Sequence, residues 1–321
     1  MLKKLIVVCN PRSSRAGMIE REVLEPARKL RGWLVGKYEV QAIGVDENAE
    51  QLAKILDDGD LVIVAGGDGT AAIALNATVL SDKDVSLAVM GYGNFNDMAR
   101  LTKVKPPVEY GDGYVGGIME IVERYEAGKV MELHPLEVWI DGKHWRYAGC
   151  YVTLGLFAES TAVFDQEKVR LKLREKRGSL VFSVWQLVKW YFRHRKEEFL
   201  PIKELRRLGN EGMAVRPDPG TTDYLAVNGP RVARVMRGGK YYLRSGEFLS
   251  VTARLGGFWR LMWFMFRSML WRIPGKKSQK DVLTFGSDAR VMIQAEGEYE
   301  ELVGIQKIEI GKVGKVVKVV R

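Results

Sequence analysis

Short apolar runs alternate with helical patterns through the first part of the chain, and this alternation restricts the possible fold more than any other feature. The apolar runs are LIVVCN, YEVQAI, DLVIVA and VSLAVM, and the helical patterns between them are MIEREVLEPARKL, ENAEQLAKIL and TAAIALNATVL. Buried strands joined by amphipathic helices are typical of βαβ units, whose parallel sheet is covered on both faces. We therefore predict an α/β domain with a doubly wound parallel sheet over residues 1–127.

The pattern changes after about residue 128. Strand-like runs joined by Gly, Asn and Asp turns follow, namely LEVWIDGKHWRYAGCYVTLG, DYLAVNGPRVARV, GGKYYLRSGEFLSVTARL and ARVMIQAEGEYEELVGIQKIEIGKVGKVVKVV. They predict an antiparallel, sandwich-like second domain over residues 128–311, with 312–321 able to return to the first sheet. The stretch KPPVEYGDGYVGG is the expected hinge. A cleft between two such domains is where ligands most often bind.

The composition suits a soluble globular protein with a positive surface. Of the 321 residues, 46% are hydrophobic and 28% are charged, and 50 Lys and Arg against 40 Asp and Glu give a net charge of +10. A field of this sign favours nucleotides, nucleic acid or anionic lipid headgroups. Because the basic residues are scattered among acids and form no stripe, we expect no nucleic acid partner.

Cysteine and histidine are too few for several classes of site. Cys9 and Cys150 are the only cysteines, and there are three histidines. These counts argue against a disulfide framework, a structural zinc site and a His-based metal centre. The stretch MLKKLIVVCNP is too short for a secretory signal and fits a first strand. We therefore expect a cytoplasmic protein.

The run DLVIVA ends in the glycine turn Gly66, Gly67, Asp68 and Gly69. In an open parallel sheet, ligands bind beyond the carboxyl ends of the strands, and glycines let the backbone approach a ligand closely. Thr70 can cap the following helix, whose N-terminus can bind phosphate. An aspartate is repelled by phosphate unless a cation or a transferable proton lies between them. Asp68 therefore predicts Mg²⁺-nucleotide chemistry on an exposed turn, and the alternative is an Asp that only bonds to its own backbone.

Two more polar loops follow strands of the same predicted sheet. NPRSSRAG comes after the first strand and supplies small donors and two arginines. GYGNFNDMAR comes after VSLAVM and has Asn96 and Asp97 at the predicted start of a helix. Three such loops at one edge of a sheet favour a nucleotide site over chance turns.

The segments NPRSS, GGDGT and GNFNDMAR, in this order and at this spacing, resemble the diacylglycerol kinase catalytic domain family, which includes bacterial lipid kinases and sphingosine kinases. The likeness extends over nearly the whole chain. GGDGT is shared with NAD kinases and phosphofructokinases, so GNFNDMAR is the more specific element. It parallels the family's G-T-G-N-D-F-A-R: Asn94 and Phe95 depart from that pattern, while Asn96, Asp97, Ala99 and Arg100 match it.

This resemblance implies an ATP-dependent, Mg²⁺-using kinase that acts on a lipid hydroxyl, of diacylglycerol, a sphingoid base or a related lipid. The positions that match the family's nucleotide contacts are Asn10, Pro11, Arg12, Ser13, Ser14, Gly66, Gly67, Asp68, Gly69, Thr70, Gly93, Asn94, Asn96 and Asp97. Asp68 and Asp97 are the implied metal-side residues. We expect Asp68 to be required for turnover and not for folding, because it is predicted on an exposed turn.

The second domain contains two departures from the family pattern. Glu296, Gly297 and Glu298 stand where the family usually reads Asp-Gly-Glu, and one of these acids is implied as the base that takes the hydroxyl proton. Ser245 stands where the family often has an Asp that helps to hold a structural Mg²⁺. A hydroxyl is a poor ligand for this hard cation, so we expect that ion to be missing.

Two other functions stay open on the sequence alone. A soluble NAD kinase-like enzyme would share GGDGT, although GNFNDMAR argues against it. A catalytically inactive nucleotide- or lipid-binding homologue would explain the departures at Asn94, Ser245 and Glu296. The sequence also leaves a homodimer open.

The segment FWRLMWFMFRSMLWR is aromatic, basic and too short to span a bilayer, which takes about 20 apolar residues. At helical spacing, Trp259, Trp263, Phe266 and Leu270 share one face, and Arg260 and Arg267 share another. Trp beside Arg suits the headgroup boundary, so we predict peripheral contact with an anionic membrane at its inner face. The alternative is an ordinary core helix, which we prefer for the similar stretch SLVFSVWQLVKWYFRHRK.

Overall fold

The computed structural model describes residues 3–13, 15–93, 96–104, 108–110, 113–115, 117–165, 200–208, 214–215, 217, 220–232, 236–238, 240–255 and 258–321. Ser14, Asn94, the helix predicted in 179–196 and part of the expected hinge lie outside the described residues. The chain divides into two compact units. The first contains residues 1–135, 147–149 and 313–321, and the second contains residues 136–146 and 150–312.

The first unit is built on a six-stranded sheet. Its strands, in order across the sheet, are β2 (Trp33–Glu39), β1 (Lys3–Cys9), β3 (Leu61–Gly66), β4 (Ser86–Gly91), β22 (Val317–Val320) and β7 (Val130–Leu133). All neighbours are parallel except β7, which runs antiparallel to β22. Every residue of β3 is buried, as expected for a strand covered on both faces. The predicted doubly wound parallel sheet is confirmed.

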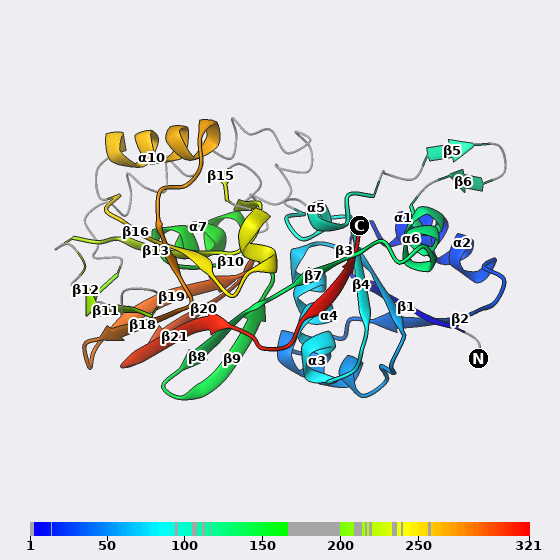
Figure 1. Cartoon of the computed structure of the whole chain (residues 1–321), viewed down its shortest axis with the longest axis horizontal. Coiled ribbons are helices and arrows are strands. Elements are labelled where there is room, and N and C mark those ends of the chain that lie inside the picture. The colour runs from blue at the N-terminus through cyan, green and yellow to red at the C-terminus, as the bar shows by residue number, and fades with distance from the viewer. Residues whose placement is uncertain are drawn as a thin grey trace. The chain divides into compact units, whose positions relative to one another are not determined.

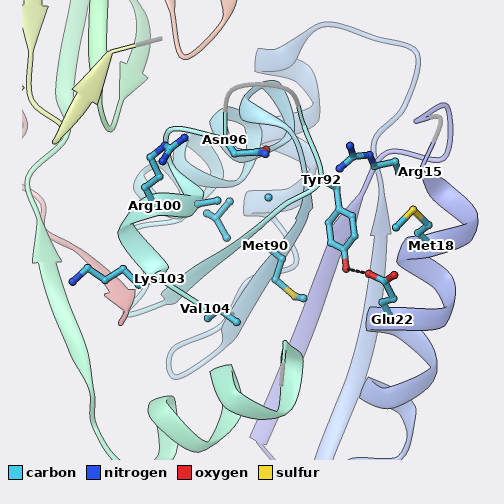
Figure 2. A pocket seen from close by; sticks show the side chains of 12 residues that line it. Arg15, Met18, Glu22, Met90, Tyr92, Asn96, Arg100, Lys103 and Val104 are labelled. Carbon is cyan, nitrogen blue, oxygen red and sulfur yellow. Dashed lines mark hydrogen bonds between the residues drawn. The ribbon is translucent and has the colours of Figure 1, made fainter. Parts of the chain in front are cut away.

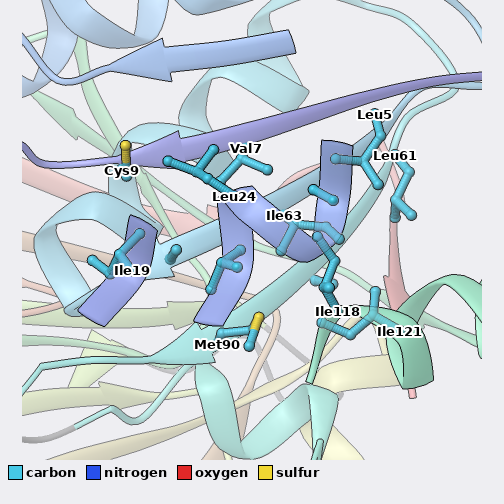
Figure 3. Close-up of a cluster of buried hydrophobic side chains, with 14 of the residues drawn as sticks. Leu5, Val7, Cys9, Ile19, Leu24, Leu61, Ile63, Met90, Ile118 and Ile121 are labelled. Atoms are coloured by element: carbon cyan, nitrogen blue, oxygen red, sulfur yellow. The ribbon is translucent and has the colours of Figure 1, made fainter. Parts of the chain in front are cut away.

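Helices cover both faces of this sheet (Figure 1). They are α1 (Ala16–Ile19), a π-helical turn η1 (Glu20–Leu24), α2 (Glu25–Arg28), α3 (Val45–Ala53), α4 (Asp68–Leu80), α5 (Ala99–Thr102) and α6 (Ile118–Glu126). On one face, Ile19 and Leu24 from the first helical segment and Ile121 from α6 pack against Val7 and Ile63 of the sheet (Figure 3). A short hairpin of β5 (Val108–Tyr110) and β6 (Gly113–Val115) lies within the expected hinge.

The second unit contains two six-stranded sheets whose described pairings are antiparallel. One has the order β17 (Lys276–Ser278), β16 (Phe248–Ala253), β13 (Asp223–Val227), β10 (Tyr151–Gly155), β19 (Arg290–Ala295) and β20 (Glu298–Val303). The other has the order β12 (Ala214–Val215), β11 (Ile202–Leu208), β18 (Lys280–Phe285), β21 (Lys307–Lys312), β8 (Leu136–Ile140) and β9 (Lys143–Ala148).

Buried polar contacts join the two sheets of the second unit. The Tyr224 hydroxyl on β13 donates to Asp281 on β18 over 2.7 Å, and the Arg207 guanidinium on β11 donates to Ser250 on β16 over 2.8 Å. The sheets therefore face each other, and the predicted sandwich-like domain is confirmed. Its other elements are α7 (Leu156–Asp165), β14 (Arg231–Val232), β15 (Met236–Arg237), a 3₁₀ helix η2 (Lys240–Arg244) and α10 (Phe258–Leu270).

Two predicted strands differ from the structure. The strand expected at YEVQAI begins earlier, at Trp33, because the whole of β2 pairs in register with β1. The segment GGKYYLRSGEFLSVTARL is not strand throughout, since η2 occupies its first part and β16 begins only at Phe248. Between them the Ser245 hydroxyl closes a turn by accepting the backbone N–H of Glu247 at 3.3 Å.

Candidate functional site

The loops that follow β3 and β4 are in direct contact. A Cβ atom on Gly93 would lie 2.5 Å from the Cα of Gly67, which is far inside van der Waals contact. The backbone N–H of Tyr92 donates to the carbonyl of Gly66 over 2.9 Å. The glycines were expected to make room for a ligand, but at Gly67 and Gly93 they make room for each other's backbone.

Asp68 fixes the loop after β4 with its carboxylate. Oδ2 accepts the backbone N–H of Asn96 and Oδ1 accepts that of Asp97, each at 2.8 Å, and Met98 contributes a third backbone N–H bond. Burial raises the pKa of the Asp68 carboxyl, and these hydrogen bonds to its charged form oppose the rise. The prediction of an exposed turn was therefore wrong, because Asp68 begins α4, connects two loops and is half-buried.

These contacts bear on whether Asp68 can hold Mg²⁺. A carboxylate has about four acceptor positions, and the backbone N–H groups of Asn96, Asp97 and Met98 bond to this one. These bonds occupy much of the Asp68 carboxylate and leave little of it for a direct bond to Mg²⁺. Asp97, its predicted companion, is buried with Oδ1 3.7 Å from Nε of Arg100.

Asn96 holds the loop after β4 in an unusual shape. Its φ angle is +55°, in the left-handed region that Asn tolerates better than most residues. Its side chain makes two bonds to Gly93, because Oδ1 accepts the N–H at 2.7 Å and Nδ2 donates to the carbonyl at 2.8 Å. Thr70 does not cap α4 as predicted. The N-cap is Gly67, without a side-chain bond, and Thr70 is buried inside the first turn.

The loop after β1 is stabilised by its own side chains. Asn10 Oδ1 accepts the backbone N–H of Arg12 at 2.9 Å, and Ser13 Oγ accepts that of Arg15 at 3.3 Å. The Arg12 guanidinium donates to the carbonyl of Gln41 over 2.8 Å, which directs it toward the end of β2. Pro11 and Arg12 are exposed.

A cavity of about 740 Å³ lies in the first unit between α1, η1, the end of β4 and α5. It is lined by Arg15, Met18, Glu22, Val89, Met90, Gly91, Tyr92, Asn96, Ala99, Arg100, Lys103 and Val104. Figure 2 shows Arg100 and Lys103 on one side and Arg15 and Tyr92 on the other. The Tyr92 hydroxyl donates to Glu22 over 2.8 Å. Three cations and one carboxylate line the cavity, and one of these cations, Arg100, also pairs with Asp97. The lining is therefore net positive and suits an anionic ligand, and the volume is typical of small-molecule sites.

Of the described residues predicted as nucleotide contacts, Asn96 lines this cavity. Arg15 and Arg100 lie within the motifs that predicted the site, but Glu22, Tyr92 and Lys103 were not singled out. Glu22 and Tyr92 are 70 residues apart in sequence, so only the fold reveals their pairing. Lys103 ends α5 with φ +54°, three residues after the arginine of GNFNDMAR.

The two late acids belong to the second unit and have different surroundings. β19 and β20 are joined by a two-residue turn in which Glu296 and Gly297 have φ angles of +52° and +90°. This is the pattern of a type I′ hairpin. The Glu296 side chain is fully buried and accepts the backbone N–H groups of Cys150 and Tyr151. Glu298 is the first residue of β20 and is partly exposed.

The first unit is thus an α/β domain whose sheet has glycine-rich motifs at one edge and a basic cavity beside them. Residues 4–130 match the family model of the diacylglycerol kinase catalytic domain. The resemblance predicted from the motifs is thereby confirmed over this part of the chain. No curated protein matches the sequence significantly.

Solved structures show the same fold across both units. The crystal structure of a diacylglycerol kinase from Bacillus anthracis str. Sterne matches with a TM-score of 0.66 at 14% identity, covering 99% of this chain and 96% of that one. Another structure from the same strain has a TM-score of 0.64 at 15% identity, with the same coverage. An NAD kinase from Archaeoglobus fulgidus, in complex with ATP, has a TM-score of 0.45 at 13% identity and covers 99% of this chain and 93% of that one. At 14% and 15% identity, the likeness to the two Bacillus anthracis structures is one of fold.

Proposed function

We propose that this protein is a phosphotransferase that moves the γ-phosphate of ATP to a hydroxyl group of a membrane lipid. The observation that carries the proposal is a basic cavity bordered by the GNFNDMAR segment, inside a match to the diacylglycerol kinase catalytic domain. Phosphoryl transfer depends mostly on positioning and charge neutralisation. Arg15, Arg100 and Lys103 are the groups proposed to neutralise nucleotide phosphates.

The loop contacts support a division of roles in the first unit. Asp68 acts as a positioning residue, because its carboxylate holds the backbone of the loop from which Asn96 faces the cavity. Mg²⁺ commonly binds through substrate phosphates with one or two carboxylates. Since backbone N–H groups already bond to both oxygens of Asp68, we propose that any Mg²⁺ is carried mainly by the nucleotide.

We propose Glu298 as the general base and Glu296 as the residue that positions it. A base must come within hydrogen-bond reach of the proton that it removes. Glu298 is partly exposed, whereas Glu296 is fully enclosed and bonded to the backbone at Cys150. Glu296 therefore stabilises the turn, and Glu298, two residues on, is the carboxylate that a substrate hydroxyl can approach.

Incubation of the purified protein with γ-labelled ATP, Mg²⁺ and a total lipid extract tests the proposal. A labelled lipid should form with the parent protein and not with Glu298→Gln, and mass spectrometry of the product identifies the acceptor. Tight ATP binding without any labelled lipid would favour the inactive-homologue alternative. Labelling of NAD in place of lipid would favour the NAD kinase alternative.

A further inference from the structure

Helix α10 presents an apolar face to solvent. Trp259 is 81% exposed, Trp263 60%, Phe266 52% and Leu270 48%, and Trp271 directly after the helix is 58% exposed. The four helix positions repeat at intervals of four, three and four residues, so they form one stripe. The stripe is about 17 Å long at 1.5 Å per residue. Exposed aromatic surface of this extent usually marks a contact with a partner.

The opposite side of α10 is anchored in the second unit, so the exposed stripe is held in place. Leu261, Phe264 and Ser268 are buried. The ring of Phe264 packs on that of Phe157 in α7, with centroids 5.9 Å apart. The Arg237 guanidinium donates to the carbonyl of Leu270 over 3.1 Å and so satisfies the helix C-terminus.

Three exposed arginines accompany the stripe. Arg260 and Arg267 lie along one edge of it, and Arg272 follows the helix. No acidic residue occurs between Phe258 and Arg272. None of the three arginines forms an ion pair among the described residues. A second copy of the chain on this face would bring like charges together, whereas an anionic bilayer complements them.

We propose that α10 lies flat on an anionic bilayer, with its tryptophans in the headgroup boundary and its arginines on lipid phosphates. None of the described helices is long and apolar enough to cross a membrane. This docking rests on the proposed function, because a kinase that acts on a membrane lipid has to reach the bilayer surface. Phe157 follows β10, whose first residue Tyr151 bonds to Glu296, so the docked helix belongs to the same unit as the proposed base.

Vesicle sedimentation without nucleotide tests the docking separately from the kinase reaction. The probes are vesicles of phosphatidylcholine alone and of phosphatidylcholine mixed with phosphatidylglycerol. The parent should bind the mixed vesicles more tightly and release them as salt is added. Trp259→Ala with Trp263→Ala should weaken binding by about tenfold or more. Arg260→Glu with Arg267→Glu should do the same for the mixed vesicles only, since each basic residue near the surface contributes roughly fivefold.

Leu34→Ala with Val303→Ala is the matched control, because these apolar side chains are 59% and 65% exposed and belong to β2 and β20. It should bind like the parent. If the tryptophan variant fails to fold, quenching of the parent's tryptophan fluorescence by brominated lipid replaces it, and strong quenching is expected.

Equal binding of both vesicle types by the parent would overturn the proposal. The proposal would also be overturned if the parent formed a dimer in solution and the tryptophan variant were monomeric but still bound vesicles. Kinase inactivity with intact vesicle binding would refute the proposed function alone.

Discussion

The backbone N–H of Asn96 donates to Oδ2 of Asp68 over 2.8 Å, across a sequence separation of 28 residues. This bond joins GGDGT to GNFNDMAR, the two motifs on which the family resemblance mainly rests. The aspartate at the glycine turn is thus occupied in shaping the neighbouring loop. Backbone N–H groups stabilise its negative charge, which reduces the repulsion that a nearby phosphate would meet.

Asp68→Asn should destabilise the first unit. The amide replaces one acceptor oxygen with a donor that faces a backbone N–H, and a hydrogen bond to a charged group contributes about 1.5–3 kcal/mol. We expect a lower melting temperature together with weaker ATP binding, measured by thermal unfolding and calorimetric titration. Asp82→Asn is the control, because the Asp82 side chain is 96% exposed. An unchanged melting temperature with abolished turnover would return Asp68 to a direct catalytic role.

Glu298→Gln and Glu296→Gln should separate chemistry from positioning. Loss of a general base lowers turnover by about 10²–10⁴-fold, so Glu298→Gln should be nearly inactive with normal thermal stability. Glu296→Gln keeps an acceptor for the N–H of Cys150, so it should retain more activity but melt at a lower temperature. Rates and melting curves of both variants decide the matter. The reverse pattern would make Glu296 the base.

Arg100→Gln and Lys103→Gln should each weaken ATP binding by about tenfold or more, because a charge-assisted bond contributes about 1.5–3 kcal/mol. Calorimetric titration with ATP measures the effect. Arg21→Gln is a matched control on the exposed side of η1. If all three variants bind ATP as the parent does, the basic cavity does not hold the nucleotide phosphates.

Asp223 should make the stability of the second unit depend on pH. Its buried carboxyl accepts the N–H of Phe157 at 2.9 Å, and burial raises its pKa from 3.8 to about 7. The folded state therefore keeps a proton that the unfolded state loses above about pH 4. The free energy of unfolding falls as pH rises from about 4 to 7, by at most about 1.4 kcal/mol per pH unit. Above about pH 7 the contribution of Asp223 no longer changes with pH.

Asp223→Asn should remove that contribution, since the amide retains an acceptor for Phe157 and does not titrate. The measurement is the difference in unfolding free energy between parent and variant across this pH range. Asp288→Asn, at an exposed position, is the control. A difference that does not change with pH would show that Asp223 has an ordinary pKa in the folded protein.

The sequence predicted what depends on local pattern. The apolar runs located β1, β3 and β4, and the spacing of aromatic residues located α10. Contacts between distant segments could not be read in this way. Glu296 is buried because β10 pairs with β19, placing Val152 opposite Ala295, and no local signal at the Glu-Gly-Glu turn indicates that pairing. The contact of Gly67 with Gly93 has the same origin, since both glycines looked like ligand-facing residues.

The position of β22 has a consequence for biosynthesis. This strand, formed by residues 317–320, lies between β4 and β7, whose residues are made long before it. At about 5–20 residues per second, the ribosome needs roughly ten to forty seconds to pass from β7 to β22. During that time the facing edges of β4 and β7 have no strand between them, and open edges invite pairing with other chains. Synthesis of the first unit therefore begins before that of the second unit and ends after it. A nascent chain stalled within the second unit would lack the strand that separates β4 from β7 in the first sheet.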